Sequence, residues 1–120
     1  MKVVVTSSGT SLDAAVDPRF GRAPQFICVD TATGETTVID NTAGVSAAQG
    51  AGVQAAETVA RLGADCLLTG HCGPKAFRAL EAANIPVYVG ASGTVADALQ
   101  QLEKGRLERA TKPDVGGHWA

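Results

Sequence analysis

The sequence has few aromatic residues and no large excess of either charge. Phe, Trp and Tyr make up 4% of the 120 residues, whereas alanine, valine and glycine recur throughout, so we expect a core of small side chains in which helices pack closely on a sheet. The net charge is −2, from 10 basic and 12 acidic residues. Such a balance gives no global attraction to nucleic acid or to an anionic membrane, and any anion site must come from a local group of basic residues.

Long apolar runs and cysteine pairs are also missing. No stretch approaches the roughly 18 apolar residues needed to span a bilayer, and the run Met1–Thr6 ends too early for a signal peptide, so we expect a cytoplasmic protein. The three cysteines, Cys28, Cys66 and Cys72, form no CxxC pair. They predict neither a disulfide framework nor a zinc or iron–sulfur site built only on protein thiolates.

Hydrophobic residues make up 45% of the chain and charged residues 18%, which is typical of a globular domain. The predicted strands at 25–31 and 35–40 are joined so closely that they must form an antiparallel hairpin, and the later strand–helix units require parallel strands. We therefore predict an α/β domain over residues 1–107, with a mixed five-stranded sheet and helices on its faces, followed by a flexible polar tail over 108–120. The other predicted strands are 3–5, 65–69 and 86–90, and the predicted helices are 53–62, 74–84 and 94–105.

The segment Gly70-His71-Cys72-Gly73-Pro74-Lys75 carries the strongest sign of chemistry. A strand enters a glycine turn, and a helix begins directly after it with Pro74 at its first position. Unpaired amides and the helix dipole favour an anion at such a helix start, and Lys75 adds a full positive charge. His71 and Cys72 lie where a parallel strand ends, which is where α/β folds place ligands. The same pattern is also typical of an ordinary strand-to-helix turn.

The loop 17–24 is a second candidate, because Arg19 and Arg22 flank Phe20 and Gly21 within it. The planar guanidinium group of arginine suits oxyanions and the sulfide-rich faces of an anionic cluster. The alternative is structural: both arginines can pair with Asp13, Asp17 or the carboxyl end of a helix.

The glycine-rich segment 41–52 is a third candidate, since it ends at a predicted helix start. Amides near Gly50 and Gly52 can bind an anion there. The segment lacks the Lys-Ser/Thr ending of a P-loop, so nucleotide binding is weakly supported. A surface loop without a ligand is the alternative.

The cysteines differ in their sequence context. Cys28 and Cys66 fall within predicted strands and are expected in the core. Cys72 lies next to His71 at a helix start, which favours the thiolate and makes it the best candidate for direct sulfur contact. A loop cysteine without a ligand role is the alternative. His118, near Trp119, has no context that supports a role.

The combined order of motifs resembles the dinitrogenase iron–molybdenum cofactor-binding family, which includes NifX-like and NifY-like carriers and the tail domain of NifB. The resemblance spans about residues 1–107. It implies a ribonuclease H-like fold and the non-covalent storage or carriage of a molybdenum- or iron-containing sulfur cluster, without catalysis. The segments that carry it are 17–23, 50–52, 69–77, 83–88 and 93–107.

The resemblance also implies a set of site residues and a cargo. Family motifs fall on Arg19, Gly21 and Arg22 and on Gly70, Gly73, Pro74 and Lys75, whereas His71 and Cys72 fall where the family varies. Among stand-alone members, the chain is similar to those that hold a molybdenum–copper sulfide cluster; the alternative cargo is the iron–molybdenum cofactor or a precursor. We expect a monomer whose partners are the cluster and proteins of cofactor delivery, with no nucleic acid and no membrane. The predicted cluster-binding residues are Arg19, Gly21, Arg22, Gly50, Gly52, Gly70, His71, Cys72, Gly73 and Lys75, with Cys72 as the candidate metal ligand.

Two other functions stay open. An adapter would work through protein contacts without bound metal, and its charged tail would serve as a docking arm. A ribonuclease H-like hydrolase would need converging carboxylates on the central strands. The first strand has no carboxylate, and Asp30, Asp40 and Asp65 lie near strand ends, so this function is the less favoured one.

Overall fold

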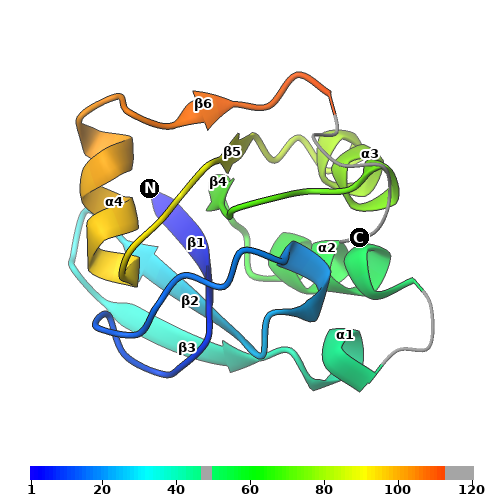
Figure 1. The fold of residues 1–120 in the computed structure, drawn as a ribbon, viewed down its shortest axis with the longest axis horizontal. Helices are drawn as coiled ribbons and strands as arrows, with labels where there is room; N and C mark the ends of the chain where they lie inside the picture. The colour runs from blue at the N-terminus through cyan, green and yellow to red at the C-terminus, as the bar shows by residue number, and fades with distance from the viewer. Residues whose placement is uncertain (47–49, 113–120) are drawn as a thin grey trace.

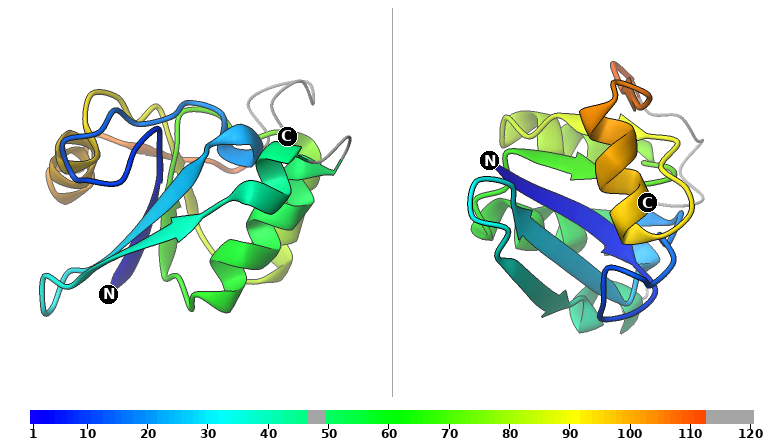
Figure 2. Two further views of the ribbon diagram at one scale, coloured as in Figure 1. Left: turned by 90° about the horizontal axis from the view of Figure 1, so that it is seen from below. Right: turned by 90° about the vertical axis from the view of Figure 1, so that its left-hand side faces the viewer.

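A six-stranded mixed sheet runs through the computed structural model, which describes residues 1–46 and 50–112. The strand order is β3-β2-β1-β4-β5-β6, with helices packed on both faces (Figures 1 and 2). None of the described helices is long and apolar enough to cross a membrane. The strands are β1 (Lys2–Ser7), β2 (Gln25–Asp30), β3 (Thr36–Asp40), β4 (Cys66–Leu68), β5 (Val87–Val89) and β6 (Glu108–Arg109), and the helices are the 3₁₀ turn η1 (Phe20–Arg22), α1 (Thr42–Ser46), α2 (Ala51–Arg61), α3 (Pro74–Ala82) and α4 (Val95–Glu103).

The mixed α/β architecture is confirmed, but the prediction of five strands is wrong. The additional strand, β6, pairs antiparallel with β5 through Tyr88 with Arg109 and Val89 with Glu108. It lies within the stretch predicted as a flexible tail. Its two charged residues are exposed and show no hydrophobic pattern from which a strand could be predicted. The ribonuclease H-like assignment stays a prediction, and residues 113–120, with His118, lie outside the described residues.

Two apolar layers join the helices to the sheet. Successive side chains of a strand point to opposite faces, so Val4 packs beneath α2 and α3, whereas Val3 and Val5 pack beneath α4. Figure 2 shows α4 on one side of the sheet and α2 and α3 together on the other. The composition predicts helices packed closely on the sheet through small side chains. In the layer that contains Val4, these include Ala55, Ala56 and Ala76.

The carboxyl ends of β1, β3, β4 and β5 lie along the same side of the sheet, which we call the carboxyl edge. β1, β4 and β5 are parallel neighbours, and both β1 and β3 run antiparallel to β2, so β3 has the direction of β1. At this edge the chain forms η1 after β1, α1 and the start of α2 after β3, the start of α3 after β4, and the start of α4 after β5 (Figure 1). Segments that are distant in sequence therefore meet there.

Cys28 and Cys66 lie in β2 and β4 and are buried, as expected. Burial raises the pKa of both thiols. The pKa of Cys66 rises to about 11, with the neighbouring Asp65 carboxylate as the second cause. Both thiols therefore stay protonated at neutral pH, where a protonated thiol is a poor metal ligand.

This burial predicts a pH dependence of stability. The folded protein keeps Cys66 protonated, whereas the unfolded chain releases the proton above the ordinary thiol value of 9.0, so stability is lost as the pH rises from there to about 11. We expect this loss to be about 2–3 kcal/mol larger in the wild type than in Cys66→Ala. Urea unfolding measures the free energy of unfolding of each protein across this pH range. Each value is compared with that of the same protein at neutral pH, so the cavity left by the substitution cancels. Parallel pH profiles would contradict the prediction.

Candidate functional site

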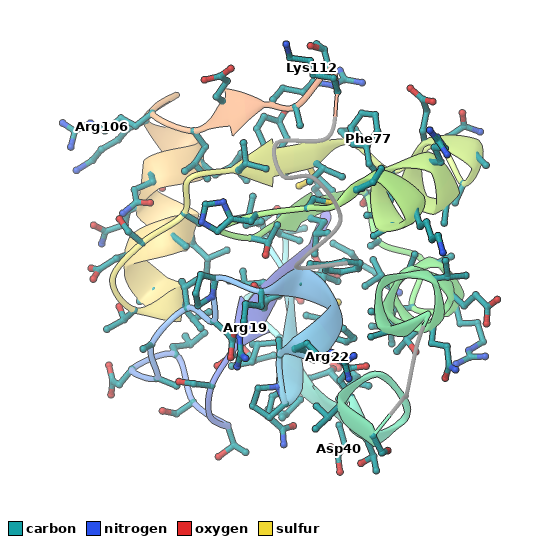
Figure 3. The ribbon with its side chains drawn as sticks, turned by 45° about the vertical axis from the view of Figure 1, so that its right-hand side comes forward. Arg19, Arg22, Asp40, Phe77, Arg106 and Lys112 are labelled. Atoms are coloured by element: carbon teal, nitrogen blue, oxygen red, sulfur yellow. The ribbon has the colours of Figure 1, made fainter. Side chains whose placement is uncertain are left out.

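The ten predicted site residues come from three segments, and the fold brings all three to the carboxyl edge. The segments are η1 with the residue before it, the start of α2, and the turn from β4 into α3. α1 and α2 both contact η1, and Figure 3 shows Arg22 in η1 and Arg19 just before it. Gly50 precedes α2 with a left-handed φ of +76°, and Gly21, Gly52 and Gly73 are buried.

Two threonines at strand ends anchor the loop before η1. The Thr6 hydroxyl donates to the carbonyl of Asp17 at 2.7 Å, and the Thr6 carbonyl accepts the Asp17 N–H at 3.0 Å. The same hydroxyl lies 3.0 Å from the hydroxyl of Thr69, directly after β4. Both threonines are fully buried, so these hydrogen bonds form away from water and fix the chain at Asp17.

The next residues of this loop contact the turn after β4. A methyl group on Gly70 would lie 2.7 Å from Pro18 Cα and 2.9 Å from the Pro18 carbonyl oxygen. That oxygen accepts the N–H of His71 at 2.8 Å, and Arg19 forms a parallel bridge with His71. Only glycine permits this approach, so Gly70 serves the contact between two of the predicted segments.

Asn41, which the sequence analysis did not single out, joins η1 to α1. Its buried Nδ2 donates to the carbonyls of Ala23 at 2.7 Å and Gly21 at 3.3 Å. A methyl group on Gly44 would lie 2.6 Å from Asn41 Oδ1, so α1 packs directly on this amide. Oδ1 itself is buried and has no hydrogen-bond partner in the described part of the chain. The sequence feature that could have indicated this role is an asparagine directly after a strand, where its short amide side chain can pair with nearby carbonyls.

The arginines of the first loop contact protein groups. Arg19 Nε lies 3.5 Å from Asp17 Oδ1, and the Arg19 side chain is 45% exposed. Arg22 Nη1 donates to the carbonyls of Gly44 at 3.4 Å and Val45 at 3.2 Å, near the end of α1. These are the structural pairings that the sequence left open, and the Asp17 carboxylate offsets part of the positive charge that Arg19 brings to the carboxyl edge.

The start of α4 has its amides paired. Thr94 and Asp97 form a capping box, with distances of 3.1 Å and 3.0 Å. The carbonyls of Ala14 and Leu12 accept the N–H groups of the first two helical residues at 2.9 Å and 3.0 Å. These amides are therefore not available to a ligand.

The start of α3 differs. Gly73 precedes the helix without a side-chain cap, and Pro74 at the first position has no N–H. Within residues 1–46 and 50–112, no acceptor is found for the N–H of Lys75 or Ala76. The Lys75 side chain is exposed and forms no ion pair with a described residue. Amide donors and a cation are thus present together at this helix start.

The two residues of the turn that could contact a metal lie in different surroundings. Cys72 is 1% exposed and belongs to the apolar layer beneath α2 and α3. Its Sγ is 3.8 Å from the carbonyl of Gly73, a weak contact. His71 is half-buried. The sequence placed Cys72 next to His71 at a helix start as the best candidate for direct sulfur contact, whereas contact with a cluster would require its sulfur to leave the apolar layer.

The side chains present fit a preformed cluster better than a bare ion. Among the described residues, no group of three or more His, Cys, Asp or Glu side chains could hold a metal ion. A cluster that brings its own sulfides has its metals already coordinated, and it needs amide donors, cations and a surface of matching shape. The carboxyl edge supplies the first two.

Comparison with known proteins agrees with this chemistry. The family described as dinitrogenase iron-molybdenum cofactor matches residues 1–105. The chain belongs to this family. The resemblance found in the motifs is therefore confirmed, and membership supports a role in binding a metal cluster or cofactor.

Solved structures extend the comparison over the whole fold. The apo form of the orange protein from Desulfovibrio gigas is 44% identical, with 95% of this chain and 96% of that chain covered and a TM-score of 0.92. A candidate NifB protein from Thermotoga is 34% identical, with 97% and 98% covered and a TM-score of 0.84. A comparison of sequence alone adds an uncharacterized protein of Methanocaldococcus jannaschii, which is 28% identical over 97 residues, or 78% of this chain and 81% of that protein.

Gly70→Ala should destabilise the protein and displace the first loop. The added methyl group overlaps the backbone of Pro18, and such overpacking costs about 1–3 kcal/mol. Gly34→Ala is the matched control, because Gly34 has a φ of +77° and open space around it, so its cost of about 1–2 kcal/mol comes from the backbone alone. Urea unfolding measures both costs. Amide NMR shifts at Asp17 and Arg19 should change in Gly70→Ala only, and unchanged shifts there would contradict the role of this contact.

Proposed function

We propose that the chain binds a preformed, anionic metal–sulfur cluster at the carboxyl edge, without covalent bonds, and stores or carries it instead of catalysing a reaction. The observation that carries this proposal is the start of α3, where the N–H groups of Lys75 and Ala76 lack acceptors among the described residues. The bridge between Arg19 and His71 brings an arginine to the same edge. Family membership supports a metal-cluster cargo.

Each group contributes differently to the proposed binding. The amides at the start of α3, reinforced by the helix dipole, present fixed partial positive charge to the cargo. Lys75 adds a flexible full charge close by. Arg19 adds a planar guanidinium whose terminal nitrogens suit a flat anionic face. In this proposal the amides near Gly50 and Gly52 act as those of α3 do, at the start of α2.

We further propose that the cargo contains molybdenum. The molybdenum–copper sulfide cluster is the one that the motif resemblance implies, with the iron–molybdenum cofactor or its precursor as the alternative. The chain is 44% identical to the orange protein over nearly the full length of both chains. We therefore test the cluster implied for the small stand-alone members of the family first. The cluster is held without a protein thiolate, because Cys72 is 1% exposed; a direct bond from Cys72 is the alternative that Cys72→Ala tests.

Reconstitution tests the proposal. Cargo-free protein is incubated with tetrathiomolybdate and copper, desalted, and examined by visible absorbance and metal analysis. We expect a protein-bound chromophore at fixed stoichiometry in the wild type and in Cys72→Ala. Arg19→Gln and Lys75→Gln should each weaken retention about fivefold, since each removes one charge-assisted contact worth about 1 kcal/mol at an exposed site.

The matched control is Arg61→Gln, which removes an equal charge from the last turn of α2, at the opposite edge of the sheet. It should retain the chromophore as the wild type does. Arg22→Gln should chiefly lower thermal stability, because Arg22 contacts the carbonyls of Gly44 and Val45. Loss of all chromophore from the wild type on desalting would reject the proposed function and favour the adapter.

A further inference from the structure

A buried carboxylate lies next to the proposed anion site. Asp17 is 7% exposed, and it is the one charged residue among the described residues that is buried. Its position is set by the backbone, because Thr6 pairs with both its N–H and its carbonyl. A negative charge fixed at this place repels an anionic cargo, so its presence needs an explanation.

Asp17 contacts Arg19 in two ways. Asp17 Oδ1 accepts the backbone N–H of Arg19 at 2.9 Å, which shapes the loop. The same oxygen lies 3.5 Å from Arg19 Nε, and at this distance the carboxylate offsets part of the guanidinium charge. The terminal nitrogens of Arg19 have no partner in the part of the chain that the structure describes, and the side chain is 45% exposed.

We infer that Asp17 is the internal counter-ion of Arg19 and limits how tightly the carboxyl edge retains an anionic cargo. The inference rests on the proposed function. The carboxylate faces Nε and leaves the terminal nitrogens of the guanidinium to the cargo, so Arg19 can contact an anion while part of its charge is compensated from behind. Retention is then moderate, which suits a protein that must also release what it carries.

The alternative is that Asp17 only positions Arg19, and the two roles predict opposite signs. Asp17→Asn keeps an oxygen that accepts the Arg19 N–H, so the loop keeps its shape while the charge is removed. A counter-ion predicts that this variant binds an anion more tightly. A purely positioning residue predicts weaker binding, because the guanidinium loses its fixed partner.

The test compares the wild type, Asp17→Asn and Asp13→Asn. Asp13 is the matched control, because it is exposed in the same loop and forms no ion pair with a described residue. Affinity for tetrathiomolybdate, alone and with copper, is measured at low and high salt. Asp17→Asn should bind about fivefold more tightly at low salt, the gain should shrink at high salt, and Asp13→Asn should change affinity less than about twofold.

Equal or weaker binding by Asp17→Asn at low salt would overturn the inference while leaving the proposed function intact. Absence of binding in every protein, wild type included, would reject the proposed function. The inference would fall with it, because it concerns how tightly that site retains its cargo.

Discussion

The contact between Pro18 and Gly70 is the constraint on which the candidate site depends. The backbone of Pro18 lies so close to Gly70 that a single methyl group would overlap it. This approach allows the Pro18 carbonyl to accept the N–H of His71 and places Arg19 in register with the turn after β4. Without it, the loop after β1 and the start of α3 would be separate surfaces, and Arg19 would not join Lys75 and the amides of α3.

The general course of the fold could be predicted because it follows from local patterns. The β-branched run after Lys2 and the hairpin strands have the periodicity of strands, and repeated strand–helix units require parallel pairing. β6 and α1 could not be predicted in this way. β6 consists of two exposed charged residues that pair with the free side of β5, and α1 is a five-residue helix whose packing depends on the distant amide contacts of Asn41. Both are formed by tertiary contacts.

The location of the candidate site was also predictable, whereas its charge was not. Parallel strands bring their carboxyl ends to one edge, so the three motifs had to gather there. Which partner each arginine takes depends on three-dimensional neighbours: Arg19 faces Asp17, and Arg22 contacts the end of α1. The direction of Cys72 was equally undetermined, because a residue in a strand-to-helix turn can face the solvent or the core. Here it faces the core.

The different starts of α3 and α4 explain why the proposed binding involves α3 and not α4. Both helices begin at the same edge with similar dipoles, but the carbonyls of Leu12 and Ala14 and a capping box already pair the amides of α4. At α3, Gly73 and Pro74 provide no such cap, so donors are left without protein acceptors among the described residues. Capping of α4 stabilises the fold, whereas the open start of α3 can be stabilised by an anion that the protein does not supply. The sequence difference between Thr-Val-Ala-Asp and Gly-Pro-Lys-Ala thus separates a structural helix start from one that is open to a ligand.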